Sequence, residues 1–300
     1  MLGDTKVNAF DRISADASTW IGREEIATDE VSGTEARRLA ATLNLDPAPF
    51  VPGATLPIGW HVTLFPPLAP SAQIGPDGHP KKGDFLPDLG LPRRMFASRK
   101  LIFRGDLKIG EPVRRVSRIA EVTPKMGRTG LLAFVTVVHD IHGEDGRIAV
   151  TEEQKIVYRE EAASGAKKGP AEDRPEGDFE WQREVTPSPA LLFRYSAITF
   201  NAHRIHYDGD YTREEEGYPE RVVNGGLTAI LGLTMIAEKH PAPLAEFAVR
   251  NRRPLFVNRK VTLMARRTGE NETGETGEFC AVDADGFIAA TADLVWTRPS

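Results

Sequence analysis

The chain has 300 residues, of which 40% are hydrophobic and 27% charged, and this composition excludes a disordered or fibrous protein. The net charge of −5 gives no broad attraction to nucleic acid or to an anionic membrane, and no apolar run reaches the roughly 18–20 residues of a membrane span. The single cysteine, Cys280, excludes an internal disulfide, and the N-terminus lacks the apolar core of a signal peptide. We therefore expect a soluble, cytoplasmic protein of one large domain or two modest ones.

The first fifty residues are predicted to be helical, because residues 34–43 are good helix formers and two prolines follow them. The apolar segment 56–65 contains His61, which we expect in the core or in the wall of a cleft. Residues 66–92 contain seven prolines, a density that excludes helix and central strand alike. Such a long irregular loop is expected to cover a functional site.

Strands are predicted next, because β-branched and aromatic residues recur between glycine-containing turns. The predicted strands of this half are residues 100–103, 114–122, 131–141 and 148–158. Residues 162–179 are small, charged and rich in proline and glycine, as is typical of a linker.

The second half is predicted to contain one deeply buried helix. Residues 222–237 carry no charge, so a helix there would be apolar nearly all round, which indicates burial on every side. Residues 211–218 are acidic and predicted to be a loop, and strands are expected at 255–266, 278–282 and 287–297.

Two pairs of segments indicate an internal duplication. Residues 93–100 resemble 252–260 with one inserted residue, and residues 145–151 match 285–291 at five of seven positions. Because both pairs occur in the same order on either side of the linker, we predict tandem copies of one α+β fold. The expected units are residues 1–161, a degenerate copy, then the linker 162–179, and residues 180–300, which carry the site.

The stretch 193–208 holds the candidate site residues. Asn201 and His206 are five residues apart, so a short turn can point an amide and an imidazole into the same cavity. Histidine changes its charge between about pH 5 and 8 and is therefore a candidate for proton transfer. The alternative is a hydrogen-bonded structural histidine. The equivalent region of the first half, residues 43–51, contains no histidine. We therefore predict one site per chain, built by the second half, and expect the first half to shape the substrate tunnel.

The segment Asn201–His206, with the sequence NAHRIH, resembles the D-x-N-P-x-H motif of the MaoC-like (R)-specific enoyl-thioester hydratases. The longer stretch FRYSAITFNAHRIHYD is more similar still to the hydroxyacyl-thioester dehydratases of type 2 and to related hydratases of mesaconyl-C4-CoA (3-methylfumaryl-CoA). The resemblance implies that His206 is the catalytic histidine and that Asn201 occupies the position of the catalytic aspartate. Asparagine cannot act as a base, so either His206 transfers protons alone or His203 or Asp208 fills the missing role.

The resemblance also implies a tandem (double) hotdog, in which two antiparallel sheets each wrap a central helix. Its V-H-G motif at the start of the buried helix corresponds here to Val223–Gly225, followed by Gly226. Gly225 and Gly226 would offer backbone N–H groups to the thioester oxygen. Asn224 caps the helix or serves the site, or does both, and Tyr195 is a possible accessory residue.

Four arginines border the strand that enters the second sheet. One interpretation is that they bind coenzyme A phosphates or a substrate carboxylate. The alternative is that they form a solvated strand edge. They are Arg250, Arg252, Arg253 and Arg259.

The function implied by the resemblance is an enoyl-CoA hydratase, a hydro-lyase that acts on an acyl-CoA with a short, branched, dicarboxylic acyl group. No CxxC, HExxH or EF-hand spacing occurs, so no metal or other cofactor is expected. The alternatives are a hotdog thioesterase and a non-catalytic acyl-thioester-binding protein. The chain is expected to be a monomeric pseudo-dimer or a homodimer.

Overall fold

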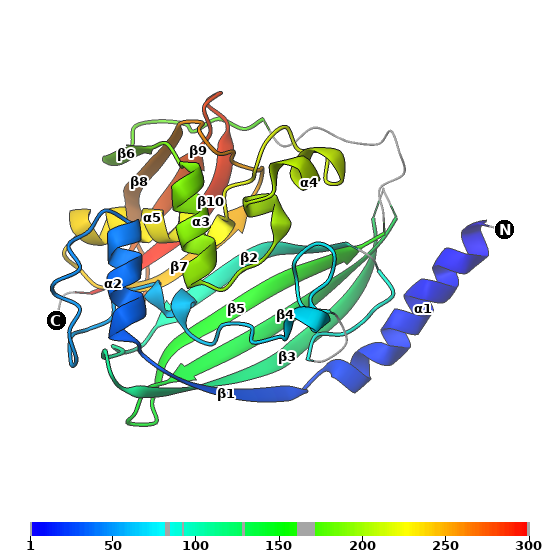
Figure 1. The fold of residues 1–300 in the computed structure, drawn as a ribbon. Helices are drawn as coiled ribbons and strands as arrows, with labels where there is room; N and C mark the ends of the chain where they lie inside the picture. Colours follow the sequence, from blue (N-terminus) through cyan, green and yellow to red (C-terminus); the bar gives the residue numbers. More distant parts are fainter. Residues whose placement is uncertain (1, 82–84, 92, 128–129, 161–171, 299–300) are drawn as a thin grey trace.

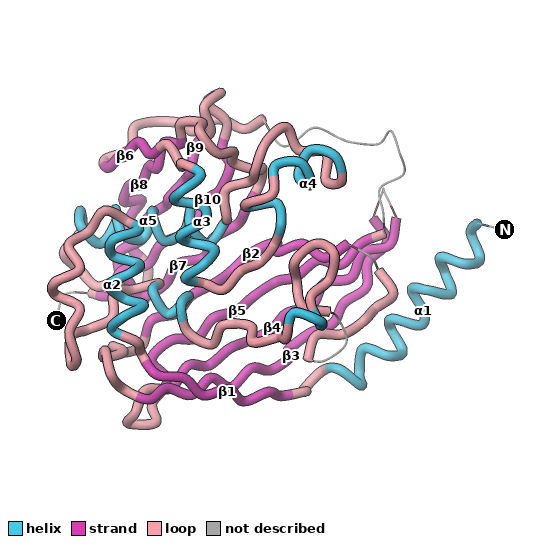
Figure 2. Tube along the Cα trace, viewed as in Figure 1, coloured by secondary structure: helices cyan, strands magenta, loops and turns pink. Residues whose placement is uncertain are grey.

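In a computed structural model of the chain, ten strands form one antiparallel sheet (Figures 1 and 2). The structure describes residues 2–81, 85–91, 93–127, 130–160 and 172–298. The strands are β1 (Glu24–Glu30), β2 (Arg93–Phe103), β3 (Pro112–Gly127), β4 (Gly130–His142), β5 (Ile148–Arg159), β6 (Trp181–Val185), β7 (Leu244–Asn251), β8 (Val261–Glu270), β9 (Gly274–Val282) and β10 (Ile288–Thr297). The helices are α1 (Leu2–Trp20), α2 (Gly33–Thr42), α3 (Pro189–Ile198), α4 (Gly209–Glu214) and α5 (Gly225–Lys239), with 3-10 turns η1 (Trp60–Thr63), η2 (Ser71–Gln73) and η3 (Arg204–His206).

The two halves of the sheet have the same strand order when each is read from its outer edge to the centre. It runs β1-β3-β4-β5-β2 and then β7-β10-β9-β8-β6, so each strand of the first half has a counterpart at the mirrored position in the second. The halves meet where β2 pairs with β7, from Ser98 opposite Arg250 to Ile102 opposite Glu246. The predicted α+β tandem architecture is therefore confirmed, with the two predicted sheets joined edge to edge into one.

Helix α5 is the enclosed helix of the second half, as its charge-free sequence predicts. It packs on strands β6 to β9 (Figure 1), and eight of its residues are buried. A Cβ atom added at Gly232 would lie 2.7 Å from the Phe279 ring, so a glycine at this position lets the helix approach the sheet. None of the helices in the described part of the chain is both long and apolar enough to cross a membrane.

Among the described residues of the first half, no helix matches α5. Between α2 and β2, the described residues form only the turns η1 and η2 and an irregular loop, in agreement with the proline density there. The apolar side chains of this segment, Trp60 and Leu64, instead join the same core as α5. Helix α1 packs on β3 and β4, where Ile13 and Ala17 belong to a second cluster of buried side chains.

Several predicted boundaries were wrong. Residues 24–30 are not helical but form the edge strand β1. Its apolar residue Ile26 is 60% exposed, so the sequence there lacks the alternation of apolar and polar residues that indicates a half-buried strand. Residues 209–214 form α4 rather than a loop because the Asp208 side chain accepts a hydrogen bond from Tyr211 N–H and caps the helix. The strand expected from residue 255 begins at Val261, and β1, β6 and β7 were not predicted.

One of the two repeat matches is correct. Residues 145–151 and 285–291 both lie at the turn into β5 and its counterpart β10, as the predicted duplication requires. The match of residues 93–100 with 252–260 is wrong, because β2 corresponds to β7, whereas residues 252–260 lie between β7 and β8. The predicted linker lies partly outside the described residues, and its described part, residues 172–179, contains neither helix nor strand.

Candidate active site

A tight turn after α3 presents the candidate residues. Helix α3 begins where the Ser188 side chain accepts a hydrogen bond from Leu191 N–H, and it ends at Ile198 with Thr199 as its C-cap. Phe200 then adopts a left-handed backbone conformation with φ of 50°, and the chain turns into η3. This reversal places Asn201, His203 and His206 close to one another and to the start of α5.

His206 is buried, with 8% of its surface exposed, and its orientation is fixed by the backbone. Its Nδ1 atom lies 2.8 Å from the carbonyl oxygen of Val222, two residues before the α5 N-cap. A carbonyl oxygen only accepts, so Nδ1 carries a proton and donates it, and Nε2 of the neutral ring is left with its lone pair. Burial lowers the pKa of His206, although the bond to Val222 acts in the opposite direction. The ring is therefore neutral at pH 7, with Nε2 available as a base.

Asn201 and Asn224 both hold the backbone with their side-chain oxygens. The Oδ1 atom of Asn201 accepts a hydrogen bond from His203 N–H at 3.0 Å, which leaves its amide N–H groups as donors. The Oδ1 atom of Asn224 accepts from Gly226 N–H at 2.9 Å and caps α5. The cap therefore occupies Gly226 N–H, whereas Gly225 N–H has no acceptor among the described residues.

Tyr195 points its hydroxyl at the first turn of α5. Only 1% of its surface is exposed, and its hydroxyl has no hydrogen-bond partner in the part of the chain that the structure describes. A Cβ atom added at Gly226 would lie 2.6 Å from this oxygen, so the glycine is required for the approach. Burial raises the pKa of Tyr195, which keeps the hydroxyl protonated and able to donate. The start of α5 thus combines a free N–H group with a free O–H group.

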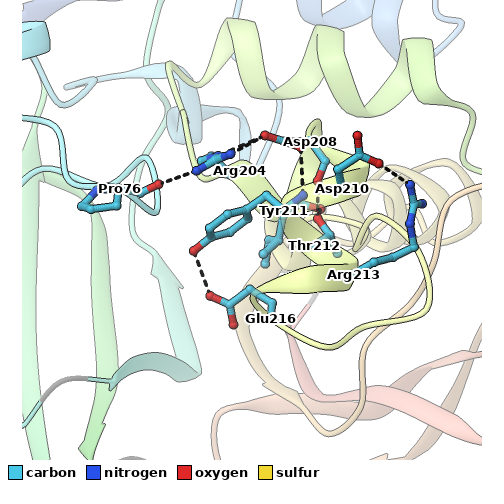
Figure 3. A network of polar contacts seen from close by, with 9 residues as sticks. Pro76, Arg204, Asp208, Asp210, Tyr211, Thr212, Arg213 and Glu216 are labelled. Atoms are coloured by element: carbon cyan, nitrogen blue, oxygen red, sulfur yellow. Dashed lines mark hydrogen bonds and ion pairs between the residues drawn. The ribbon is translucent and has the colours of Figure 1, made fainter.

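Asp208 is engaged in structural contacts. Figure 3 shows Arg204 extended between Pro76 and Asp208, and its Nη2 atom lies 2.7 Å from Asp208 Oδ2. The other carboxylate oxygen, Oδ1, accepts from Tyr211 N–H at 3.0 Å. The hydrogen bond from Arg204 is the main reason that the pKa of Asp208 lies below its usual value. With both oxygens occupied, Asp208 holds the turn and the start of α4 together.

A hairpin of the first half, residues 73–81, packs directly on this turn. The backbone of Asp77 accepts Arg204 N–H at 2.9 Å, and a Cβ atom added at Gly78 would lie 1.8 Å from the Ala202 carbonyl oxygen. The hairpin carries His79, whose ring centroid is 4.1 Å from that of His203. The His203 ring is in turn 5.4 Å from that of His206. The long loop therefore covers the candidate site, as its length predicts.

A buried charged cluster lies on the sheet face of the first half. Glu152, 6% exposed, has its Oε1 atom 2.6 Å from Arg99 Nε and its Oε2 atom 3.2 Å from His61 Nε2. Burial alone would raise the pKa of Glu152, but the Arg99 charge and the His61 hydrogen bond together hold it well below its usual range. Arg99 and Glu152 also act electrostatically on Tyr195, so the cluster lies beside the start of α5. His61 is a buried residue, as predicted.

The four arginines fall into two classes. Arg253 lies 3.0 Å from Asp283, and Arg252 forms an ion pair with Asp173. Arg250 and Arg259 form no ion pair with any described residue, although the Arg259 guanidinium lies over the Phe256 ring, 5.4 Å from its centroid. The second class therefore carries charges that no described carboxylate neutralises.

Sequence reasoning missed the residues that the first half contributes to this region. Asp77, His79, Arg99 and Glu152 are far from residues 193–208 in the chain, and no motif spacing connects them. The proline-rich loop was predicted to cover a functional site. That prediction did not show which of its side chains would lie there.

Comparisons with known proteins agree with this architecture. The family model for hydroxyacyl-thioester dehydratase type 2 matches residues 59–257. The chain is 43% identical over 283 residues to the mesaconyl-C(4)-CoA hydratase of Chloroflexus aurantiacus, an alignment that covers 94% of this chain and 98% of the relative. It is 24% identical to the mitochondrial hydroxyacyl-thioester dehydratase type 2 of Schizosaccharomyces pombe, over 70% of this chain and 78% of that one. A solved MaoC-like dehydratase from Phytophthora capsici has the same fold, with a TM-score of 0.69, 14% identity, and 96% of this chain and 99% of that chain covered.

Proposed function

The chain belongs to the hydroxyacyl-thioester dehydratase type 2 family, and we propose that it hydrates the double bond of a short, branched, dicarboxylic enoyl-CoA of the mesaconyl-C4-CoA kind. The reaction class follows from the family: the protein is a hydro-lyase that acts on an acyl-CoA thioester. The acyl group is proposed from the identity of 43% with the Chloroflexus relative across almost the full length of both chains.

The orientation of His206 is the observation that carries the mechanism. Its Nδ1–H is held by Val222 at 2.8 Å, so the neutral ring offers Nε2 to a water molecule. As the water oxygen attacks the β-carbon of the thioester, Nε2 takes one of its protons. We assign the amide N–H groups of Asn201 to holding that water, because the amide oxygen already accepts a hydrogen bond from His203 N–H.

Addition to the β-carbon moves negative charge onto the thioester oxygen, which requires hydrogen-bond donors in fixed positions. We assign this role to Gly225 N–H and the Tyr195 hydroxyl, donors at the start of α5 that have no acceptor in the described part of the chain. The positive end of the helix dipole supports the same charge. Gly226 contributes by leaving space for the Tyr195 hydroxyl rather than by donating its own N–H.

Coenzyme A phosphates are assigned to Arg250 and Arg259, whose charges are not neutralised by a described carboxylate. Arg252 and Arg253 are assigned a structural role through Asp173 and Asp283. Because β2 and β7 join two hotdog halves within one chain, we infer that a single chain can form the complete site as a pseudo-dimer.

The experiment follows the enoyl-thioester absorbance and free thiol together over a panel of enoyl-CoA substrates, including mono- and dicarboxylic acyl groups. The proposal expects absorbance to fall without thiol release, fastest for the branched dicarboxylic substrates. Thiol release would show a thioesterase, and a preference for unbranched monocarboxylic substrates would contradict the proposed acyl group.

A further inference from the structure

The site lacks one of the two proton-transfer groups that hydration requires. A base must take a proton from water, and an acid must give a proton to the α-carbon. His206 supplies the base, but Asn201 has no titratable group and Asp208 is held by Arg204 and the α4 backbone. Unless His206 transfers both protons itself, another group near His206 carries the second one.

The hairpin of the first half brings a carboxylate–imidazole pair to this position. The Nδ1 atom of His79 lies 3.0 Å from Asp77 Oδ2, and the other oxygen of Asp77 accepts His79 N–H at 3.0 Å. Such a carboxylate fixes the orientation of an imidazole and stabilises its protonated form. The His79 side chain is 33% exposed, so it can exchange protons with solvent.

The hairpin is held rigidly against the turn that carries His206. Arg204 Nη1 donates to the Pro76 carbonyl at 3.1 Å while its other nitrogens bind Asp208, and Arg204 N–H donates to the Asp77 carbonyl. The His203 ring contacts the rings of both His79 and His206. The contact between this first-half hairpin and the second-half turn places His79 beside the second-half histidines.

We propose, on the basis of the function proposed above, that the Asp77–His79 pair is the second proton-transfer group of this site. His79 gives the proton to the α-carbon and Asp77 is its positioning residue. The water oxygen bonds to the β-carbon, one water proton passes to His206 Nε2, and the electrons of the double bond move to the α-carbon, which takes the proton of the His79 imidazolium. The cycle leaves His206 protonated and His79 neutral, and proton exchange with solvent restores both.

The electrostatics of the cluster fit two histidines with opposite roles. After burial, which is the largest effect, a positive charge on His79 further lowers the pKa of His206, so a protonated His79 favours the neutral form of the base. Burial, followed by His79, lowers the pKa of His203 to about 3, so this ring is neutral between them. The charged or titratable groups that face the cluster are Asp77, His79, His203, His206, Arg94, Arg204, Asp208 and Tyr211.

The test compares His79→Gln and Asp77→Asn with Lys81→Ala. Lys81 is an exposed residue of the same hairpin, and its ammonium group donates to the Ala72 carbonyl. We expect His79→Gln to lower kcat about 10²–10⁴-fold, with KM and thermal stability near those of wild type. The decline of kcat at alkaline pH should disappear in His79→Gln, and imidazole should partly restore the activity of His79→Ala. Lys81→Ala should match wild type.

Three results would overturn the proposal. A His79→Gln variant within about threefold of wild type shows that the pair is dispensable, and a loss of activity that follows a loss of stability shows that the hairpin is only structural. Stoichiometric Zn²⁺ in the purified protein, removed with its activity by a chelator, shows instead a metal site, because Asp77, His79 and His203 offer donor atoms within 4.8 Å of one another. A wild-type protein that hydrates no enoyl-CoA would overturn the proposed function itself, which these variants do not test.

Discussion

The Nδ1–H group of His206 donates to the carbonyl oxygen of Val222 across 2.8 Å, and this contact connects the turn that carries His206 to the start of α5. The bond fixes the tautomer of the ring, and burial keeps the ring neutral. The proposed base and the helix end that we assign to the thioester oxygen are therefore positioned by the same short segment of backbone.

The first prediction concerns pH. Burial disfavours the imidazolium form, so His206 remains a neutral base below the usual histidine pKa of 6.5 and the rate is lost only as pH falls through the lowered value. The acid limb of kcat/KM should therefore lie below pH 6.5. A pH–rate profile measures it, and an acid limb above pH 7 would show that another group is the base.

The second prediction separates activity from stability at Tyr195. Its hydroxyl is buried without a partner, so Tyr195→Phe removes an unpaired polar group and should leave the free energy of unfolding unchanged or raise it. If the hydroxyl holds the thioester oxygen, kcat should nevertheless fall about 10²–10³-fold. Denaturant unfolding and steady-state kinetics on the same sample decide it. Equal loss of stability and activity would indicate a packing role only.

The third prediction is a double-mutant cycle. In Gly226→Ala the new Cβ atom would lie 2.6 Å from the Tyr195 hydroxyl oxygen, which must move and lose its position at the helix start. Activity should fall, although alanine has a helix propensity about 1 kcal/mol more favourable than that of glycine. In the Tyr195→Phe background the clashing oxygen is absent, so Gly226→Ala should have little further effect on kcat. Additive losses in the double variant would contradict the proposed contact.

The fourth prediction concerns acid stability. The folded-state pKa of Glu152 is lower than its usual value of 4.5, so its contribution to stability is complete above about pH 5 and is lost as pH falls through the folded-state pKa. Glu152→Gln should destabilise the protein by about 3–5 kcal/mol near pH 7, because Arg99 is left buried without its counter-charge. The difference in unfolding free energy between variant and wild type should shrink at acid pH. A difference that is constant down to pH 3 would exclude an ionised Glu152 as its cause.

The architecture could be predicted where the sequence pattern is strong. The charge-free run of α5 indicated a helix buried on every side, and the match between residues 145–151 and 285–291 identified equivalent positions of two copies. The edge strand β1 was missed because its apolar residue Ile26 faces solvent. Pairing with β3, which local sequence does not reveal, determines its conformation.

The candidate site was only half visible in the sequence. His206, Asn201 and the glycines of α5 belong to local motifs, whereas Asp77 and His79 reach the site through a hairpin of the other half. Gly226 N–H was predicted to donate to the substrate. In the structure it donates to the Asn224 side chain, which caps α5, so it is not free to donate to the substrate. Such contacts depend on tertiary packing, which residue spacing does not encode.

The central claim is that His206 Nε2 takes the proton of the attacking water. The most direct test measures hydration of a dicarboxylic enoyl-CoA by His206→Gln beside His142→Gln, a histidine whose Nδ1 atom also contacts a backbone carbonyl, that of Gly146 at 3.0 Å, but at the turn between β4 and β5. The account predicts a loss of kcat of about 10²–10⁴-fold for His206→Gln with the fold intact, and no change for His142→Gln. A folded His206→Gln protein that hydrates the substrate at the wild-type rate would contradict it.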